Sequence, residues 1–331
     1  MHRAAVFVLL AGVLALSAGG PAPADTAVAP EVIHAEALYK NGDYKQAVSV
    51  LTAYLATHPK DTGALVDRGD DYTALGNQDA AIADYTAALA INPYFAYAYA
   101  SRCESYTRLD EDQRATADCD KAIELQPKLA YAYRVRAMLA LDRDDGQAAL
   151  ADANQALELV PSSAGALISR CRAYILLKRF KEAAADCDSV TQIDPTDDFG
   201  FFYRGRAEIG LSQWPAAIVD FHAALRLDST DTNAYYWLAI AQLSTGAYAA
   251  ALADVDRYIK TNIDDGDGHL VRAAIESNLG NTAEARESAT TALRHYEIVN
   301  DQSKAAKAQA LLDALKAKAS PSPSATPSPS S

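Results

Sequence analysis

The chain has 331 residues, of which half are hydrophobic and 22% are charged, and it is rich in alanine and tyrosine. This composition favours an all-helical soluble protein with enough chain for a continuous core. A formal net charge of −13 argues against nucleic acid or an anionic membrane surface as the main partner, because both bind clustered lysine and arginine.

The first residues have the features of an export signal. An apolar run over residues 4–18 is followed by small residues that end in Ala22-Pro23-Ala24. An apolar run this short, with an A-x-A site after it, predicts a signal peptide over residues 1–24, cleaved after Ala24 or, as the second choice, after Ala18. The alternative is an uncleaved membrane anchor. We therefore expect a periplasmic or secreted protein.

Proline and alanine recur through the chain with a fixed step of 34 residues. A period of this size, with proline after a helical pattern rich in small residues, is typical of stacked helical hairpins. We number each unit from its own first residue, beginning at residue 28. The prolines at position 32 are Pro59, Pro93, Pro127, Pro161 and Pro195. The alanines at position 20 are Ala47, Ala81, Ala115, Ala149, Ala183, Ala217, Ala251 and Ala285.

The unit at residues 62–95 shows the pattern most clearly. Positions 4, 8, 11, 20, 24, 27 and 32 are Leu65, Gly69, Tyr72, Ala81, Tyr85, Ala88 and Pro93. This pattern resembles the tetratricopeptide repeat, in which two antiparallel helices cross at their small residues. The resemblance implies a right-handed α-solenoid of about eight helix-turn-helix repeats. They would span residues 28–61, 62–95, 96–129, 130–163, 164–197, 198–231, 232–265 and 266–299.

Two further segments follow the repeats. Residues 300–319 predict a helix with Leu311, Leu312 and Leu315 on one side, as needed to cap the last hydrophobic face of a solenoid. Residues 320–331 contain only serine, proline, alanine and threonine. That composition cannot form a packed core, so we expect a disordered tail.

No group of residues predicts catalysis or a cofactor. The six histidines form neither a metal-binding pair nor a triad with a plausible nucleophile. Two acidic glycine-containing runs, at residues 142–146 and 264–268, lack the sixth-position glycine and twelfth-position glutamate of a calcium loop, and predict turns between helices. We therefore expect no enzyme, no cofactor and no metal site.

The four cysteines occupy positions 8 and 24 of two repeats: Cys103 with Cys119, and Cys171 with Cys187. Pairing between the two repeats would span several helix diameters, whereas a disulfide needs Cα atoms within about 7 Å. Side chains lean toward the start of their own helix, so positions 8 and 24 of an antiparallel hairpin lean toward each other. In an exported chain this favours a disulfide within each repeat. The alternative is two pairs of small buried thiols.

A second regularity is charged. Position 7 holds Arg68, Arg102, Arg136, Arg170, Arg204 and Arg272, and position 23 holds Asp84, Asp118, Asp152, Asp186, Asp220 and Asp254. Each arginine could pair with the aspartate of its own hairpin or with that of the preceding one, and the sequence leaves both registers open. Either register predicts a row of arginine–aspartate pairs along the repeats that supports the fold, which we call the arginine ladder. A guanidinium that faces a carboxylate already has its hydrogen-bond and charge partner.

The resemblance also implies where a partner binds. In the family, positions 2, 5, 9 and 12 of the first helix line the concave surface that holds extended peptides or partner helices. Position 9 changes from acidic Glu36, Asp70 and Glu104 to basic Arg172 and Arg206. The candidate groove residues are Tyr131, Arg134, Met138, Ile168, Arg172, Phe199, Phe202, Arg206, Tyr236 and Ile240. Aromatic and arginine side chains on such a surface are typical of binding hot spots.

We therefore expect a non-enzymatic scaffold that binds a peptide or a partner protein in this groove, with neither a nucleic acid partner nor a small-molecule substrate. Ordinary solvated helix faces with a chance order of charges are the alternative at these positions. A self-assembling structural protein of the cell envelope is the alternative function, and the sequence leaves the oligomeric state open.

Overall fold

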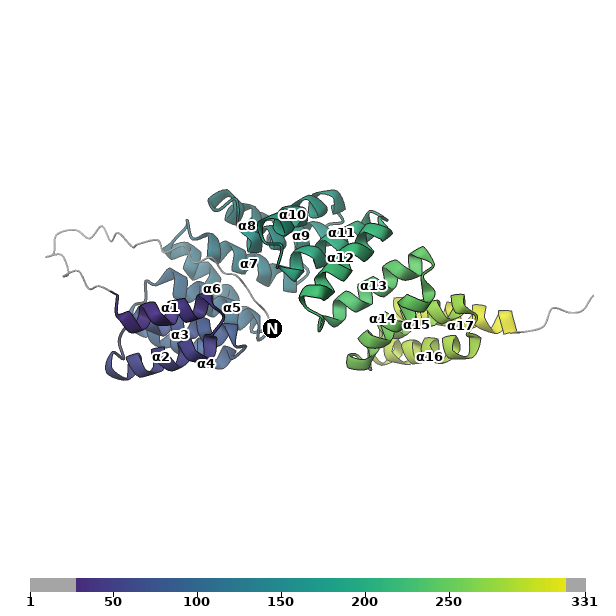
Figure 1. The fold of residues 1–331 in the computed structure, drawn as a ribbon, viewed down its shortest axis with the longest axis horizontal. Helices are drawn as coiled ribbons and strands as arrows, with labels where there is room; N and C mark the ends of the chain where they lie inside the picture. Colours follow the sequence, from purple (N-terminus) through teal and green to yellow (C-terminus); the bar gives the residue numbers. More distant parts are fainter. Residues whose placement is uncertain (1–27, 320–331) are drawn as a thin grey trace, which may run out of the picture. The chain divides into compact units, whose positions relative to one another are not determined.

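The computed structural model describes residues 28–319, and within them it contains seventeen α-helices and no β-strand (Figure 1). The helices are α1 Pro30–Lys40, α2 Tyr44–Thr57, α3 Thr62–Ala74, α4 Gln78–Ile91, α5 Ala96–Thr107, α6 Asp112–Leu125, α7 Ala130–Asp142, α8 Gly146–Leu159, α9 Ala164–Leu176, α10 Phe180–Ile193, α11 Asp198–Gly210, α12 Trp214–Leu227, α13 Thr232–Thr245, α14 Tyr248–Thr261, α15 Gly266–Leu279, α16 Thr282–Ile298 and α17 Gln302–Ala319. The predicted signal peptide and tail lie outside the described residues.

The chain divides into two compact units, the first ending at Arg179 and the second beginning at Phe180. The first contains α1 to α9 and the second α10 to α17. Within each unit, every helix packs on the next helix of the chain, and first helices of neighbouring hairpins also touch, as α5 and α7 do. This is the packing expected of an α-solenoid, in which each hairpin contacts only its neighbours. No helix of the described segment is long and apolar enough to cross a membrane.

Small residues bring the two helices of each hairpin together, as predicted. All eight alanines at position 20 are completely buried. At position 8, a Cβ atom added to Gly69 would lie 2.5 Å from Cε1 of Tyr85, the residue at position 24 of the same hairpin. Gly205 and Phe221 repeat this contact at 3.0 Å. Positions 8 and 24 therefore face each other, with a small residue opposite a large one.

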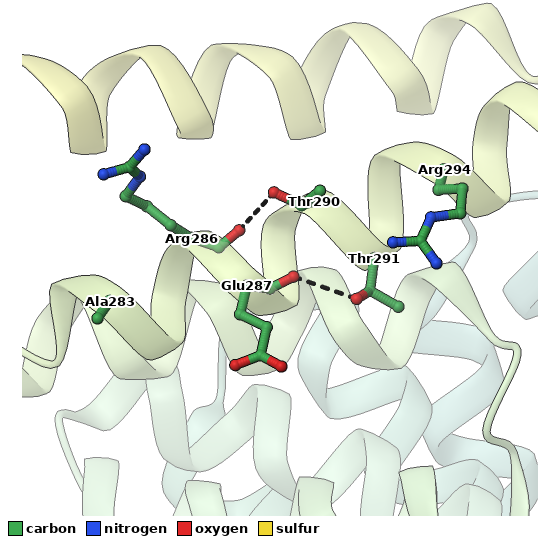
Figure 2. A pocket seen from close by; sticks show the side chains of 6 residues that line it. All are labelled: Ala283, Arg286, Glu287, Thr290, Thr291 and Arg294. Atoms are coloured by element: carbon green, nitrogen blue, oxygen red, sulfur yellow. Dashed lines mark hydrogen bonds between the residues drawn. The ribbon is translucent and has the colours of Figure 1, made fainter.

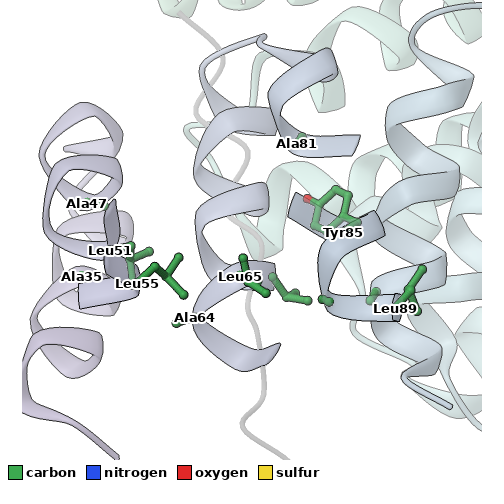
Figure 3. Close-up of a cluster of buried hydrophobic side chains, with 12 residues drawn as sticks. Ala35, Ala47, Leu51, Leu55, Ala64, Leu65, Ala81, Tyr85 and Leu89 are labelled. Atoms are coloured by element: carbon green, nitrogen blue, oxygen red, sulfur yellow. The ribbon is translucent and has the colours of Figure 1, made fainter. Parts of the chain in front are cut away.

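Large apolar residues fill the space between hairpins. In the first unit, Leu51, Leu55 and Leu65 pack with Tyr85 and Leu89 in one buried cluster (Figure 3). These leucines come from α2, α3 and α4, so the cluster joins the first hairpin to the second. Burying each such side chain stabilises the fold by roughly 1.5–3 kcal/mol.

The turn between the two helices of a hairpin has the same backbone conformation in every repeat. Position 15 is left-handed throughout, with φ between 55° and 85°. Glycine occupies it at Gly42, Gly76, Gly246 and Gly280, and residues with side chains occupy it at Asp110, Asp144, Lys178 and Ser212. The left-handed conformation costs an L-residue about 1–2 kcal/mol that glycine avoids. The middle repeats therefore carry strained turns.

The arginines of the ladder bind residues of their own hairpin and of the preceding one. Nε and Nη2 of Arg102 donate to the two carboxylate oxygens of Asp118 in its own hairpin, at 2.7 and 2.9 Å. Arg68, Arg136 and Arg204 bind Asp84, Asp152 and Asp220 in the same way. For these four pairs, the register within the hairpin is therefore the correct one.

The third nitrogen of each guanidinium reaches back to the preceding hairpin. Nη1 of Arg102 donates to Thr86 Oγ1 at 3.0 Å, and Nη1 of Arg136 donates to Asp120 at 2.7 Å. The acceptors all stand at position 25, and the others are Thr52, Asn154 and Asp188. Each of these arginines therefore joins its own hairpin to a polar residue of the preceding repeat.

The predicted disulfide within the third repeat is present. Cys103 and Cys119 are bonded, with a Cα–Cα distance of 5.5 Å, and both side chains are completely buried. They stand at positions 8 and 24, where other hairpins place a small residue opposite a large one. None of the cysteines in the described part of the chain is free.

Helix α17 covers the last hairpin, as predicted for a cap. Leu312 and Leu315 are buried and Leu311 is half-buried. At its start, Lys304 pairs with Asp267 at 2.7 Å, and the Tyr296 hydroxyl donates to the same carboxylate at 2.7 Å. The cap is thus fixed by apolar packing along its length and by a polar contact at its beginning.

Candidate functional site

Positions 2, 5 and 9 of the first helices form the candidate binding surface, which we call the first-helix face and describe separately for each unit. Of the ten predicted groove residues, eight are half-buried and Phe199 is 37% exposed. Phe202 is the exception, at 7% exposed. Its ring packs in the core, 6.0 Å from that of Phe221. Phe202 therefore supports the fold and is not presented on the surface, contrary to the sequence prediction.

In the first unit, the first-helix face is held by a network centred on Glu104. This carboxylate is 7% exposed. It accepts hydrogen bonds from Arg108 at 2.7 Å and from Tyr131 and Arg134 at 2.9 Å each. Burial alone would raise the pKa of Glu104, but the positive charges of Arg134 and Arg108 hold it at about 2. The predicted groove residues Tyr131 and Arg134 are thus brought together, and their polar atoms bind Glu104.

The network continues toward the N-terminal repeats through tyrosines. The hydroxyls of Tyr85 and Tyr97 donate to the two oxygens of Asp70 at 2.7 and 3.0 Å. Tyr97 stacks on Tyr131 with ring centroids 5.0 Å apart. Sequence analysis missed Tyr97, although it stands at position 2, one repeat before Tyr131. The Tyr97–Tyr131 stack joins the third and fourth repeats, and the hydrogen bond from Tyr97 to Asp70 joins the third repeat to the second.

The remaining predicted residues of the first unit lie further along its first-helix face. Arg172 pairs with Asp142 at 3.4 Å, and both side chains are partly exposed. Met138 and Ile168 are half-buried. This part of the face combines apolar and basic side chains, and the acidic Asp142 belongs to it as well.

The second unit presents a compact group of aromatic and basic side chains, which we call the aromatic patch: Phe199, Tyr203, Arg206, Tyr236 and Trp237. The Arg206 guanidinium lies 3.9 Å from the centroid of the Trp237 ring. Tyr236 meets the edge of Trp237 at 5.2 Å, and Phe199 stacks on Tyr203 at 6.3 Å. The close contact between Arg206 and Trp237 is a cation–π pair, worth about 0.5–2 kcal/mol.

Trp237 and Tyr203 were missed by sequence analysis. Both stand at position 6, next to the predicted position 5. The sequence carried part of the signal, because tryptophan, tyrosine and arginine are the residues most enriched in binding hot spots, but the exposure of position 6 depends on packing. Ile240, one turn beyond Tyr236 on α13, is half-buried and extends the patch with an apolar side chain.

A shallow hollow also lies along α16 (Figure 2). Every residue that lines it belongs to that one helix, and the hydroxyls of Thr290 and Thr291 donate to carbonyls of the preceding turn. These two hydroxyls therefore bind the helix backbone itself. Elsewhere in the described residues, no three histidine, cysteine, aspartate or glutamate side chains are grouped so that they could hold a metal ion.

The chain consists of antiparallel helix pairs that recur every 34 residues, and each pair packs on its neighbours. This arrangement defines a helical repeat protein. A family model for the tetratricopeptide repeat matches residues 34–96, 134–198 and 204–266, which together make up more than half of the chain. The chain therefore belongs to the tetratricopeptide repeat family. No curated protein sequence matches it.

Solved structures share the fold at low sequence identity. The crystal structure of the APC/C hetero-tetramer Cut9–Hcn1 superposes with a TM-score of 0.73 and 14% identity over 86% of this chain. Our chain covers 55% of the length of that one. A tetratricopeptide repeat protein from Parabacteroides merdae (TM-score 0.54, 18% identity) is matched over 77% of this chain and 98% of its own. PilW, a type IV pilus biogenesis factor (TM-score 0.57, 21% identity), is matched over 64% and 97%.

Proposed function

We propose that this protein is an exported, non-enzymatic scaffold that holds a peptide or a partner protein on its first-helix face. The observation that carries the proposal is the aromatic patch of the second unit. The Arg206 guanidinium lies 3.9 Å from the centroid of the Trp237 ring, and Phe199, two turns earlier on α11, is exposed. Tryptophan, tyrosine and arginine are the residues that most often dominate binding energy at protein interfaces.

The side chains on this face are suited to contact and not to chemical conversion. Arginine and aromatic rings supply directional hydrogen bonds and apolar area, and neither is a nucleophile or a general base at neutral pH. The chain's net charge of −13 favours a protein partner over nucleic acid. Members of the family generally act as interaction scaffolds, which supports the same assignment.

The proposed location is the periplasm or the extracellular space. The A-x-A site that follows the short apolar run supports it. The buried Cys103–Cys119 disulfide agrees with an oxidising compartment, because disulfides are rare in reducing cytosol.

The test compares partner capture by matched variants. The purified chain, immobilised, is incubated with the native secreted and envelope fraction, and bound proteins are identified. We expect Arg206→Glu/Trp237→Ala to lose a specific partner. The control is Arg257→Glu/Tyr235→Ala, because this arginine also lies over an aromatic ring, at 5.1 Å, but away from positions 2, 5, 6 and 9. Equal capture by both variants, with helicity intact, would overturn the proposal.

Light scattering over a range of concentrations tests the alternative function. Growth of large assemblies by the purified chain alone would favour a self-assembling envelope protein. A molar mass that stays constant with concentration favours the scaffold, whose partner is then a different protein.

A further inference from the structure

The N-terminal part of the first unit concentrates acidic groups that lack a matching positive charge. Asp67, Asp70 and Asp71 are spaced i, i+3 and i+4 on α3, so they share one side of that helix. The negative charge of Glu36, on α1, helps to raise the pKa of Asp67. The charges of Asp70 and Asp71 likewise help to raise the pKa of Tyr39, which also lies on α1. The three aspartates therefore form one cluster on the side of α3 near α1, which we call the acidic cluster.

Asp71 is the most unusual member. It is 1% exposed, and its Oδ1 atom has no hydrogen-bond partner in the described part of the chain. The corresponding position 10 of the next three repeats holds Ser105, Leu139 and Ala173, all buried. An unsatisfied carboxyl at a position that is otherwise small or apolar costs folding free energy. A group retained at such a cost is a candidate for function.

Neighbouring acids differ from Asp71 because each is already satisfied. Asp70 accepts hydrogen bonds from two tyrosines, Glu104 binds two arginines and a tyrosine, and Glu36 pairs with Lys40 at 2.7 Å. The charged and titratable groups that act on the cluster from the surrounding elements are Glu36, Tyr39, Asp61, Tyr85, Tyr97 and Glu104. None of these carries a positive charge.

We propose that the acidic cluster binds the ammonium or guanidinium group of a lysine or arginine in the partner segment. This inference rests on the proposed scaffold function and adds the chemistry of one contact. Asp67 is exposed, so a basic side chain of the partner can reach the cluster from solvent. The buried Asp71 supplies the carboxyl oxygen that lacks a hydrogen-bond partner. A basic side chain would provide the hydrogen-bond donors and the charge that the cluster lacks. The first-helix face of the first unit would then select basic segments.

Binding should be linked to proton release. Burial, followed by the negative charges of Asp70 and Asp67, raises the pKa of Asp71 to about 8, so this carboxyl is protonated at neutral pH. A cation bound beside it favours the ionised form. We therefore expect up to one proton to leave on binding at pH 7, and affinity to rise as pH increases from about 6 to 8.

The probe is an N-acetylated, C-amidated hexalysine peptide, titrated calorimetrically at low salt. We expect Asp67→Asn/Asp71→Asn to weaken binding about tenfold or more, through loss of the charge contacts. Asp79→Asn/Asp264→Asn is the control, because both residues are exposed and the number of carboxyl groups removed is identical. Equal loss in both variants would show diffuse attraction to an acidic protein and overturn the proposal.

Proton release is read from titrations in buffers of different ionisation enthalpy. The wild-type chain should release more protons at pH 7 than Asp71→Asn, in which the remaining release comes from Asp67, whose pKa burial and the charge of Asp70 raise to about 7. Unchanged release in Asp71→Asn would also overturn the proposal. A natural partner that needs the aromatic patch but ignores the acidic cluster would refute this inference alone and leave the scaffold function standing.

Discussion

The arginine ladder gives the sharpest test of what holds the repeats together. Arg204 is its best-connected member, with Nε and Nη2 on Asp220 at 2.7 and 2.8 Å and Nη1 on Asp188 at 2.7 Å. The Asp220 side chain is only 5% exposed. Arg204→Met would leave that carboxylate buried and unpaired, next to Glu208, whose pKa is raised to about 7 by burial and by Asp220. Loss of one partner from a buried pair costs about 3–5 kcal/mol.

Two comparison variants make the reasoning specific. Arg136→Met should cost less than Arg204→Met, because the pair of Arg136 with Asp152 is more exposed, at 32% and 13% for the two side chains. Arg204→Met/Asp220→Leu should recover most of the stability, because an apolar pair of similar volume often replaces a buried ion pair without loss.

Urea unfolding followed by circular dichroism measures these differences, at pH 8 and again at pH 4. An unpaired buried carboxylate takes up a proton in acid, so the deficit of Arg204→Met should shrink at pH 4. A deficit below about 1 kcal/mol, as for an exposed pair, would refute the reasoning. So would a double variant that is less stable than Arg204→Met.

Three further predictions concern the turns, the disulfide and the tail. Ser212→Gly should raise stability by about 1 kcal/mol, because position 15 is left-handed there. Gly246→Ala should lower stability by a similar amount, so the melting temperatures of the two variants should shift in opposite directions. Reduction of Cys103–Cys119 should cost about 3 kcal/mol in the chain-entropy model, for a sequence separation of 16, and four free thiols in the denatured, unreduced wild-type chain would contradict this pairing. A chain ending at Ala319 should melt with the full chain, because residues 320–331 have no apolar side chains to pack beyond one alanine and the prolines; a melting temperature lower by several degrees would show that the tail contributes.

The fold was predictable because its determinants recur at fixed positions. Ala81, Gly69 and Cys103 each report a close helix crossing, and the 34-residue step repeats that signal eight times. The pairing of Cys103 with Cys119 followed from the lean of side chains in an antiparallel hairpin. The register of the arginine ladder did not follow, because a long side chain can reach residues on either neighbour, and the acceptors at position 25 vary between threonine, asparagine and aspartate.

The candidate surface was less predictable, because position 5 lies at the boundary between core and solvent. At this position Arg134 stays partly exposed, whereas Phe202 turns inward against the Phe221 ring that covers Gly205. Periodicity cannot distinguish these outcomes, since they depend on the volume that opposing side chains leave free. The patch partner Trp237 was missed for the same reason, one position away.

The seventh repeat interrupts the ladder, because Leu238 stands where the arginine would be. Leu238 is buried and packs with Phe202 and Phe221 of the preceding repeat, so this joint is apolar. Partly exposed ionic contacts, such as that of Arg136 with Asp120, weaken with added salt, whereas apolar contacts weaken on cooling. The two kinds of joint should therefore open under different conditions. In hydrogen exchange, cooling would loosen the boundary between α12 and α13 first, and high salt at room temperature would loosen the arginine-linked joints first.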